Sequence, residues 1–103
     1  MVLYEVSIRV APDVAAAYRD WLAAHVSQML TFEGFEQASV YEDDPDPDGA
    51  LRLVVHYHVR DAAALDRYLT EDAPRMRADG VARFGDRFTA TRRVLRRVQA
   101  FEG

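Results

Sequence analysis

Residues 51–60 alternate strictly between two kinds of side chain. One set is wholly apolar and consists of Leu51, Leu53, Val55, Tyr57 and Val59. The other set is mostly polar and consists of Arg52, Val54, His56, His58 and Arg60. A period of two with β-branched and aromatic residues is typical of a strand with one buried face. The rest of the chain must therefore supply the elements that cover this face.

Length and composition favour one domain, because half of the 103 residues are hydrophobic and can form a real core. The chain has no cysteine, which excludes disulfides and thiolate chemistry. No apolar run approaches the roughly 20 residues that a transmembrane helix needs. The first residues lack the basic and apolar regions of a signal peptide. We therefore expect a cytoplasmic protein that does not bind membranes.

The charge of the chain is distributed unevenly. The net charge of −4 argues against general nucleic-acid binding. Residues 1–50 carry two arginines against ten acids, a charge of −8, whereas residues 51–103 carry eleven arginines against seven acids, a charge of +4. Such asymmetry can pair the two halves in space, pair two protomers, or leave an anion-binding patch.

The first half of the chain predicts a strand, a helix and a second strand. Val2–Val10 alternates as residues 51–60 do. Pro12 and Asp13 open a helix with a wide apolar stripe that ends near Leu30 or Thr31, before Gly34. Phe35–Glu42 predicts a strand with weaker alternation, and Asp43–Ala50 is rich in turn-forming residues and predicts a hairpin loop.

The second half predicts a broken helix and a last strand. Asp61 is a good N-cap for a helix, which Pro74 must break or kink. A further helical segment runs to about Phe84, where Gly85 suits a C-terminal cap. Arg87–Val98 suits both a helix face and a strand, and we expect a strand to at least Val94.

The element order is therefore βαββαβ. Two right-handed crossovers joined by a hairpin give a ferredoxin-like α+β domain over residues 1–103, with a four-stranded antiparallel sheet. The first and third strands are central and both helical regions lie on one face. The wholly apolar sets of these two strands must then face the helices.

Several segments resemble one protein family. They are Trp21–Leu30, Arg67-Tyr68-Leu69, Ala73–Ala78, Arg83–Phe88 and Thr91-Arg92-Arg93. Together they resemble the DUF4286 family, a bacterial domain of unknown function placed among the dimeric α+β barrel proteins. The resemblance covers nearly the whole chain and implies the fold and a homodimer, but no catalytic residue. Kinship with cofactor-independent monooxygenases is an analogy of fold only.

The sheet face that no helix covers is the candidate site. It should present Glu5, Ser7, Arg9, His56 and His58, with Leu3 and Val54 among them. In dimeric barrels two such faces meet and enclose a cavity. One interpretation is a ligand pocket lined by these residues, and the other, which we favour, is a polar and partly wet dimer interface.

Metal binding is a weaker interpretation of the same residues. His56 and His58 stand about 6.6 Å apart along one strand, and Glu5 on the neighbouring strand would complete a set of two histidines and a carboxylate. That spacing is common by chance, so we expect no metal. Residues 44–49 match the first half of a calcium loop, but the twelfth position is Val55 rather than glutamate. We therefore expect a solvated acidic hairpin.

Two other features favour a structural role. His25 shares an apolar stripe with Trp21 and Met29, which predicts a hydrogen-bonded core histidine. The arginines of the second half invite a phosphate-binding interpretation, but salt bridges to nearby acids explain them better. They are Arg75, Arg77, Arg83, Arg87, Arg92 and Arg93.

Two classes of function remain. The first is a homodimeric, non-catalytic module without a cofactor that binds a small molecule or a protein partner. The second is a cofactor-independent monooxygenase-like or isomerase-like enzyme that uses the His56/His58 face. We favour the first class, because the sequence contains no nucleophile–base pair and no cofactor motif.

Overall fold

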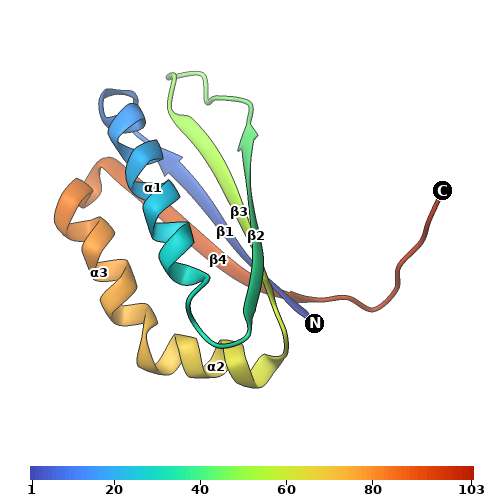
Figure 1. Cartoon of the computed structure of the whole chain (residues 1–103). Coiled ribbons are helices and arrows are strands. Elements are labelled where there is room, and N and C mark those ends of the chain that lie inside the picture. Colours follow the sequence, from blue (N-terminus) through green and yellow to red (C-terminus); the bar gives the residue numbers. More distant parts are fainter.

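The computed structural model describes all 103 residues and has one layer of helices packed on one sheet (Figure 1). The strands are β1 (Val2–Val10), β2 (Phe35–Asp43), β3 (Leu51–Val59) and β4 (Phe88–Arg96). The α-helices are α1 (Ala15–Met29), α2 (Ala62–Glu71) and α3 (Ala73–Phe84), and the short 3₁₀ turns are η1 (Pro12–Val14) and η2 (Gly85–Arg87). This is the expected ferredoxin-like α+β architecture.

The four strands form an antiparallel sheet in the order β2-β3-β1-β4. The central strands β1 and β3 pair along their full length, from Val2 opposite Val59 to Val10 opposite Leu51. The register fixes the two faces, because side chains at opposed positions point to the same side of a sheet. Figure 1 shows α1 and α3 crossing the same side of the sheet, with α2 at its end.

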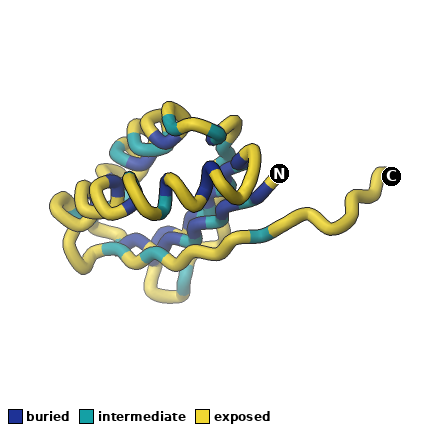
Figure 2. Tube along the Cα trace, turned by 90° about the horizontal axis from the view of Figure 1, so that it is seen from below, coloured by how far each residue is buried: buried dark blue, intermediate teal, exposed yellow.

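The core lies between the helices and the sheet. The alternate residues of β1 and β3 that the sequence assigned to the helix side are buried, and Tyr57 is only 2% exposed. Tyr18, Leu22 and Met29 of α1 cover them. Figure 2 shows the buried positions gathered between the layers, with exposed positions on the outer sides of the helices. The hydrophobic pattern thus confirms the predicted layering.

The helix boundaries follow the expected local chemistry. Asp61 caps α2, because its carboxylate accepts a hydrogen bond of 2.9 Å from the amide of Ala64. Pro74 stands in the first turn of α3, so the helical region divides at Asp72 as predicted. Gly85 ends α3 with a φ of 53°, which favours glycine.

The last strand is longer than its expected minimum and ends at Arg96. Beyond it the chain runs away from the sheet as an extended tail (Figures 1 and 2), and Phe101 in this tail is 82% exposed. The longest helix, α1, has 15 residues. None of the helices is long and apolar enough to cross a membrane.

Ion pairs within the chain join the basic second half to the acidic first half. Arginines of the second half pair with acids of the first half in several places, such as Arg87 with Asp13 and Arg67 with Glu33. Arg60 also contacts Glu33, at 3.2 Å. These pairs are exposed, so each stabilises the fold only slightly. They show that the two halves pair in space.

Candidate functional site

Glu5 is the centre of the polar cluster on the uncovered face of the sheet. The register places it between His56 on β3 and Arg93 on β4. Its carboxylate lies 2.6 Å from Nε of Arg93 and 2.8 Å from Nε2 of His56. The hydrogen bond from Arg93 and then that from His56 hold the pKa of Glu5 below its usual value. Glu5 is therefore ionised and fully paired within the chain.

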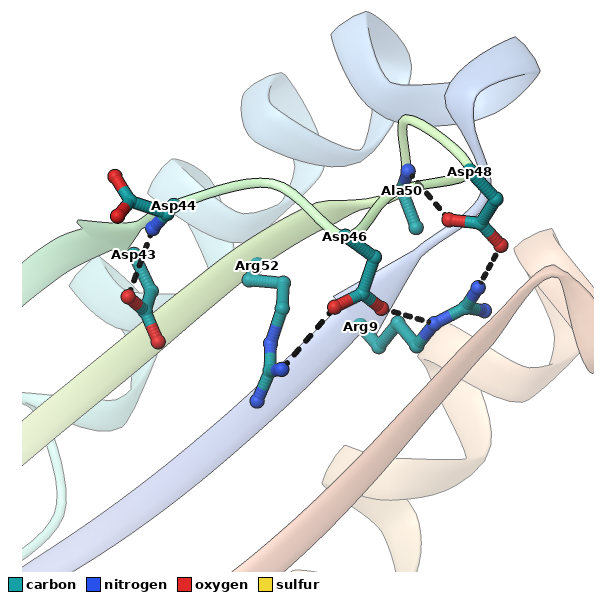
Figure 3. Close-up of polar contacts among 7 residues, drawn as sticks. All are labelled: Arg9, Asp43, Asp44, Asp46, Asp48, Ala50 and Arg52. Carbon is teal, nitrogen blue, oxygen red and sulfur yellow. Dashed lines mark hydrogen bonds and ion pairs between the residues drawn. The ribbon is translucent and has the colours of Figure 1, made fainter.

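Arg9 points towards the acidic loop between β2 and β3 (Figure 3) and is not bonded to Glu5. Its Nε donates a 2.7 Å hydrogen bond to Asp46, and its Nη2 contacts Asp48. Arg52 approaches the same Asp46 at 3.2 Å. The loop is an exposed acidic hairpin, as predicted, and in addition two of its carboxylates are bound by arginines of the sheet. A calcium ion would have to displace these guanidinium groups from the carboxylate oxygens of the loop.

His58 does not join Glu5 and His56. Its Nδ1 lies 3.3 Å from the sulfur of Met1. No three histidine, aspartate or glutamate side chains in the structure come together in a way that would hold a metal ion. Ser7 lies with Arg9, Arg52 and Val54 in a shallow hollow of the same face. The five candidate residues thus share one face, but the structure divides them into separate contacts.

A second candidate site lies on the opposite side of the sheet, inside the layer between sheet and helices. It is a cavity of about 40 Å³, room for roughly two or three water molecules. Its walls come from three strands and all three helices. The polar and aromatic side chains that line it are Tyr4, Tyr18, Trp21, His25, Tyr57, Tyr68, Arg77, Phe88 and Arg92. This cavity was not among the sites predicted from the sequence.

His25 and Trp21 stand between the cavity and the outer surface. Their rings stack, with centroids 4.6 Å apart, and both also border surface hollows beside α1 and α3. The indole nitrogen of Trp21 donates a 2.8 Å hydrogen bond to Asp79. Burial lowers the pKa of His25, so its imidazole is neutral at pH 7. The expectation of a hydrogen-bonded core histidine was wrong, because His25 is half-buried and has no hydrogen-bond partner in the structure.

Four tyrosines are among the residues that line the cavity. Burial raises the pKa of Tyr18 to about 12 and that of Tyr68 to about 12, and it raises the pKa of Tyr57 as well. These hydroxyls are therefore protonated at pH 7 and can donate hydrogen bonds. The hydroxyl of Tyr4 accepts a 3.1 Å hydrogen bond from Arg77 of α3.

Gly80 lets α3 approach Trp21 closely. A methyl group at this position would lie 3.0 Å from Cη2 of Trp21 and 3.4 Å from Cζ of Phe88. Those distances are shorter than ordinary contacts, so any larger residue would displace the indole. The absence of a side chain at Gly80 therefore sets the position of the ring that separates the cavity from the surface.

One signal in the sequence pointed towards this cavity. Phe88, Ala90, Arg92, Val94 and Arg96 form the helix-facing set of β4. Of its two charged residues, Arg92 borders the cavity. A charge on the covered face of a sheet needs a polar or solvated environment. The clustering of four tyrosines from different elements depended on register and helix packing, which the sequence did not define.

Comparisons with known proteins agree with this architecture. The family model described as "Domain of unknown function (DUF4286)" matches residues 1–98. No curated protein sequence matches the chain.

Solved structures share its fold at low sequence identity. A candidate antibiotic biosynthesis monooxygenase from Deinococcus radiodurans superposes with a TM-score of 0.75 at 14% identity, over 99% of this chain and 97% of that chain. SnoaB, a cofactor-independent oxygenase from Streptomyces nogalater, gives 0.71 at 16% identity, over 99% and 97%. Rv0793 from Mycobacterium tuberculosis gives 0.66 at 21% identity, over 99% and 100%. At these identities the likeness concerns the fold alone.

Proposed function

The chain belongs to the DUF4286 family, and we propose that it is a homodimeric module that binds a small molecule in the cavity between its helices and its sheet. The observation that carries this proposal is the composition of the cavity wall. Aromatic and aliphatic side chains form most of it, and residues with hydroxyl, imidazole and guanidinium groups border the same space. Such a combination is typical of small-molecule sites.

The uncovered face of the sheet supports the dimer. It carries Leu3 and Val54 half-buried, beside Tyr41, which is 53% exposed. Because Glu5 and Arg9 are already paired within the chain, a second copy can cover them without leaving an unpaired charge. An ion pair between Glu5 of one protomer and Arg9 of the other is therefore not needed to neutralise these charges. In this proposal the uncovered face is the dimer interface and the cavity is the binding site.

Neighbouring residues of β4 allow the two faces to be tested separately. Ala90 borders the cavity, whereas Thr91 belongs to the uncovered face. We expect native mass spectra of protein isolated without denaturant to show a dimer, twice the chain mass of 11.7 kDa, carrying an organic molecule. Ala90→Phe should fill the cavity and lose the bound molecule, and Thr91→Phe should keep it. Retention in Ala90→Phe with loss in Thr91→Phe would assign binding to the uncovered face.

A cofactor-independent oxygenase or isomerase is the second candidate. The fold likeness to SnoaB and the neutral, partner-free imidazole of His25 support it. A neutral histidine at a cavity is able to take a proton from a bound molecule. His56 does not border the cavity, because it lies on the uncovered face, where its Nε2 contacts Glu5.

Proton exchange tests this second candidate. If His25 acts as a general base, it removes an acidic C–H proton from a bound molecule in D₂O, and deuterium takes the place of that proton. The exchange should be lost in His25→Phe and kept in His56→Gln. If bound molecules show no exchange in the wild-type protein, the enzymatic candidate is excluded and binding remains as the function.

A further inference from the structure

Most arginines of this protein are paired with acids, but four are not. Nine of the thirteen arginines lie within 4.0 Å of a carboxylate oxygen. The remaining four are Arg77, Arg92, Arg96 and Arg97. Two of these four border the cavity between the helices and the sheet. Half of the arginines without a carboxylate partner therefore lie beside the cavity.

The cavity wall contains no acid that would neutralise these two guanidinium groups. Arg77 reaches the cavity from α3 and donates to the hydroxyl of Tyr4, which is uncharged. Arg92 comes from β4, opposite Val6 of β1 in the register. Asp79 of α3 lies nearby, but it bonds to Trp21 and does not border the cavity. A ligand that places a negative group between α3 and β4 would therefore contact two guanidinium groups and no carboxylate.

The charge of Arg92 is felt throughout the cavity. Burial raises the pKa values of Tyr18, Tyr57 and Tyr68, and the positive charge of Arg92 opposes that rise in all three. At His25 burial lowers the pKa, the charge of Asp79 opposes that effect, and the charge of Arg92 adds a smaller lowering. Arg77 and Arg92 are both exposed, so water partly screens their charges, and they stabilise an anion mainly through direct contact with it.

We propose that the ligand is a small planar aromatic molecule with one carboxylate, whose ring lies among the aromatic side chains and whose carboxylate is bound by Arg92 and Arg77. This inference rests on the proposed function and adds the class of ligand. Guanidinium groups match carboxylates in geometry and charge. The rings of Tyr18, Tyr57 and Phe88 provide flat apolar surfaces.

The size of the cavity limits the ligand and requires some movement. At about 40 Å³ the space is smaller than a benzene ring. Met29 and Met76 also line it, and their unbranched side chains change rotamer easily. A single ring can enter when these two side chains swing aside, whereas a large polycyclic molecule would require the helices to separate from the sheet.

Benzoate and benzamide test the charge requirement, because they have the same shape and differ in charge at neutral pH. Trp21 is the only tryptophan of the chain and borders the cavity, so its emission reports binding. Wild-type protein should bind benzoate at least tenfold more tightly than benzamide. Arg92→Gln should weaken benzoate about tenfold or more and leave benzamide unchanged. Arg77→Gln should weaken benzoate by a smaller factor.

Arg96→Gln is the matched control. Arg96 lies on the same strand and the same side of the sheet and also has no carboxylate partner, but it does not border the cavity. Its substitution should leave the affinity for benzoate unchanged. Equal binding of benzoate and benzamide, both unaffected by Arg92→Gln, would overturn the charge requirement and leave the cavity as a binding site. Failure of both compounds to bind would overturn this inference together with the proposed function.

Discussion

Arg77 of α3 and Tyr4 of β1 are joined by a hydrogen bond of 3.1 Å from Nη2 to the phenolic oxygen. This bond connects the helix layer to a central strand at the border of the cavity. Tyr4 is 2% exposed, so its hydroxyl has few other partners, whereas the guanidinium group keeps access to solvent. The same contact therefore stabilises the fold and holds a positive charge where a ligand would enter.

Removing the Tyr4 hydroxyl should weaken the protein measurably. We expect Tyr4→Phe to lower the free energy of unfolding by about 1 kcal/mol, the usual contribution of one hydrogen bond. Urea denaturation at a fixed protein concentration measures this change. Tyr57→Phe is the control, since Tyr57 is equally buried on the neighbouring strand but its hydroxyl makes no hydrogen bond in the structure. Equal losses in the two variants would contradict the role of the Arg77 contact.

A methyl group at Gly80 should displace Trp21. Alanine favours a helix interior by about 1 kcal/mol over glycine, but the added carbon would lie 3.0 Å from the indole, and crowding of this kind costs about 1–3 kcal/mol. We expect Gly80→Ala to leave stability unchanged or lower and to shift the tryptophan emission. The exposed Ala78→Gly on the same helix should lower stability by about 1 kcal/mol with no change in emission. An unchanged emission spectrum in Gly80→Ala would be inconsistent with this packing.

A charge at Val54 should disrupt the dimer. Val54 lies in the middle of the uncovered face, where an aspartate would be buried without a partner in the assembled protein. Light scattering at tens of micromolar should give a dimer for the wild type and a monomer of 11.7 kDa for Val54→Asp. Ala78→Asp adds the same charge on the exposed side of α3 and should remain a dimer. A wild-type monomer would remove the proposed interface.

His25 should make the stability of the protein depend on pH. Burial lowers its pKa in the folded state below the ordinary value of 6.5. Between these two pKa values the unfolded chain binds a proton that the folded protein does not, so stability is lost as the pH falls below about 6.5. We expect the free energy of unfolding to decrease from pH 7 to pH 5, and to decrease less in His25→Phe, which keeps the stacking on Trp21. The same pH dependence in both proteins would show that His25 does not titrate as its burial requires.

The fold was largely predictable because the alternation in Val2–Val10 and Leu51–Val59 reports directly which face of each strand is covered. Once two central strands face the same helices, the order of elements leaves one sheet arrangement. Pro74 marked the break between α2 and α3 through its own covalent geometry. Only the end of the last strand stayed open, because residues 87–98 suit a strand and a helix equally.

The candidate site was harder to predict, because it depends on contacts between distant residues. The placement of Glu5 beside His56 follows from alternation, but the ion pairs of Arg9 with the acidic loop depend on how that loop folds back. The cavity depends on how completely side chains fill the space between two layers, and periodicity contains no information about that. Arg92 was visible in the sequence as a charge in a covered set, yet its neighbours suggested salt bridges instead.

The most direct test of the account is to find which histidine senses a bound molecule. The chain has three histidines, of which His25 borders the cavity while His56 and His58 lie on the uncovered face. Imidazole Cε1–H resonances, assigned with single His→Gln variants, can be followed by NMR during titration with the tighter of benzoate and benzamide. We predict a shift of the His25 resonance with those of His56 and His58 unmoved. Shifts confined to His56 and His58 would place the ligand on the uncovered face and contradict the cavity as the binding site.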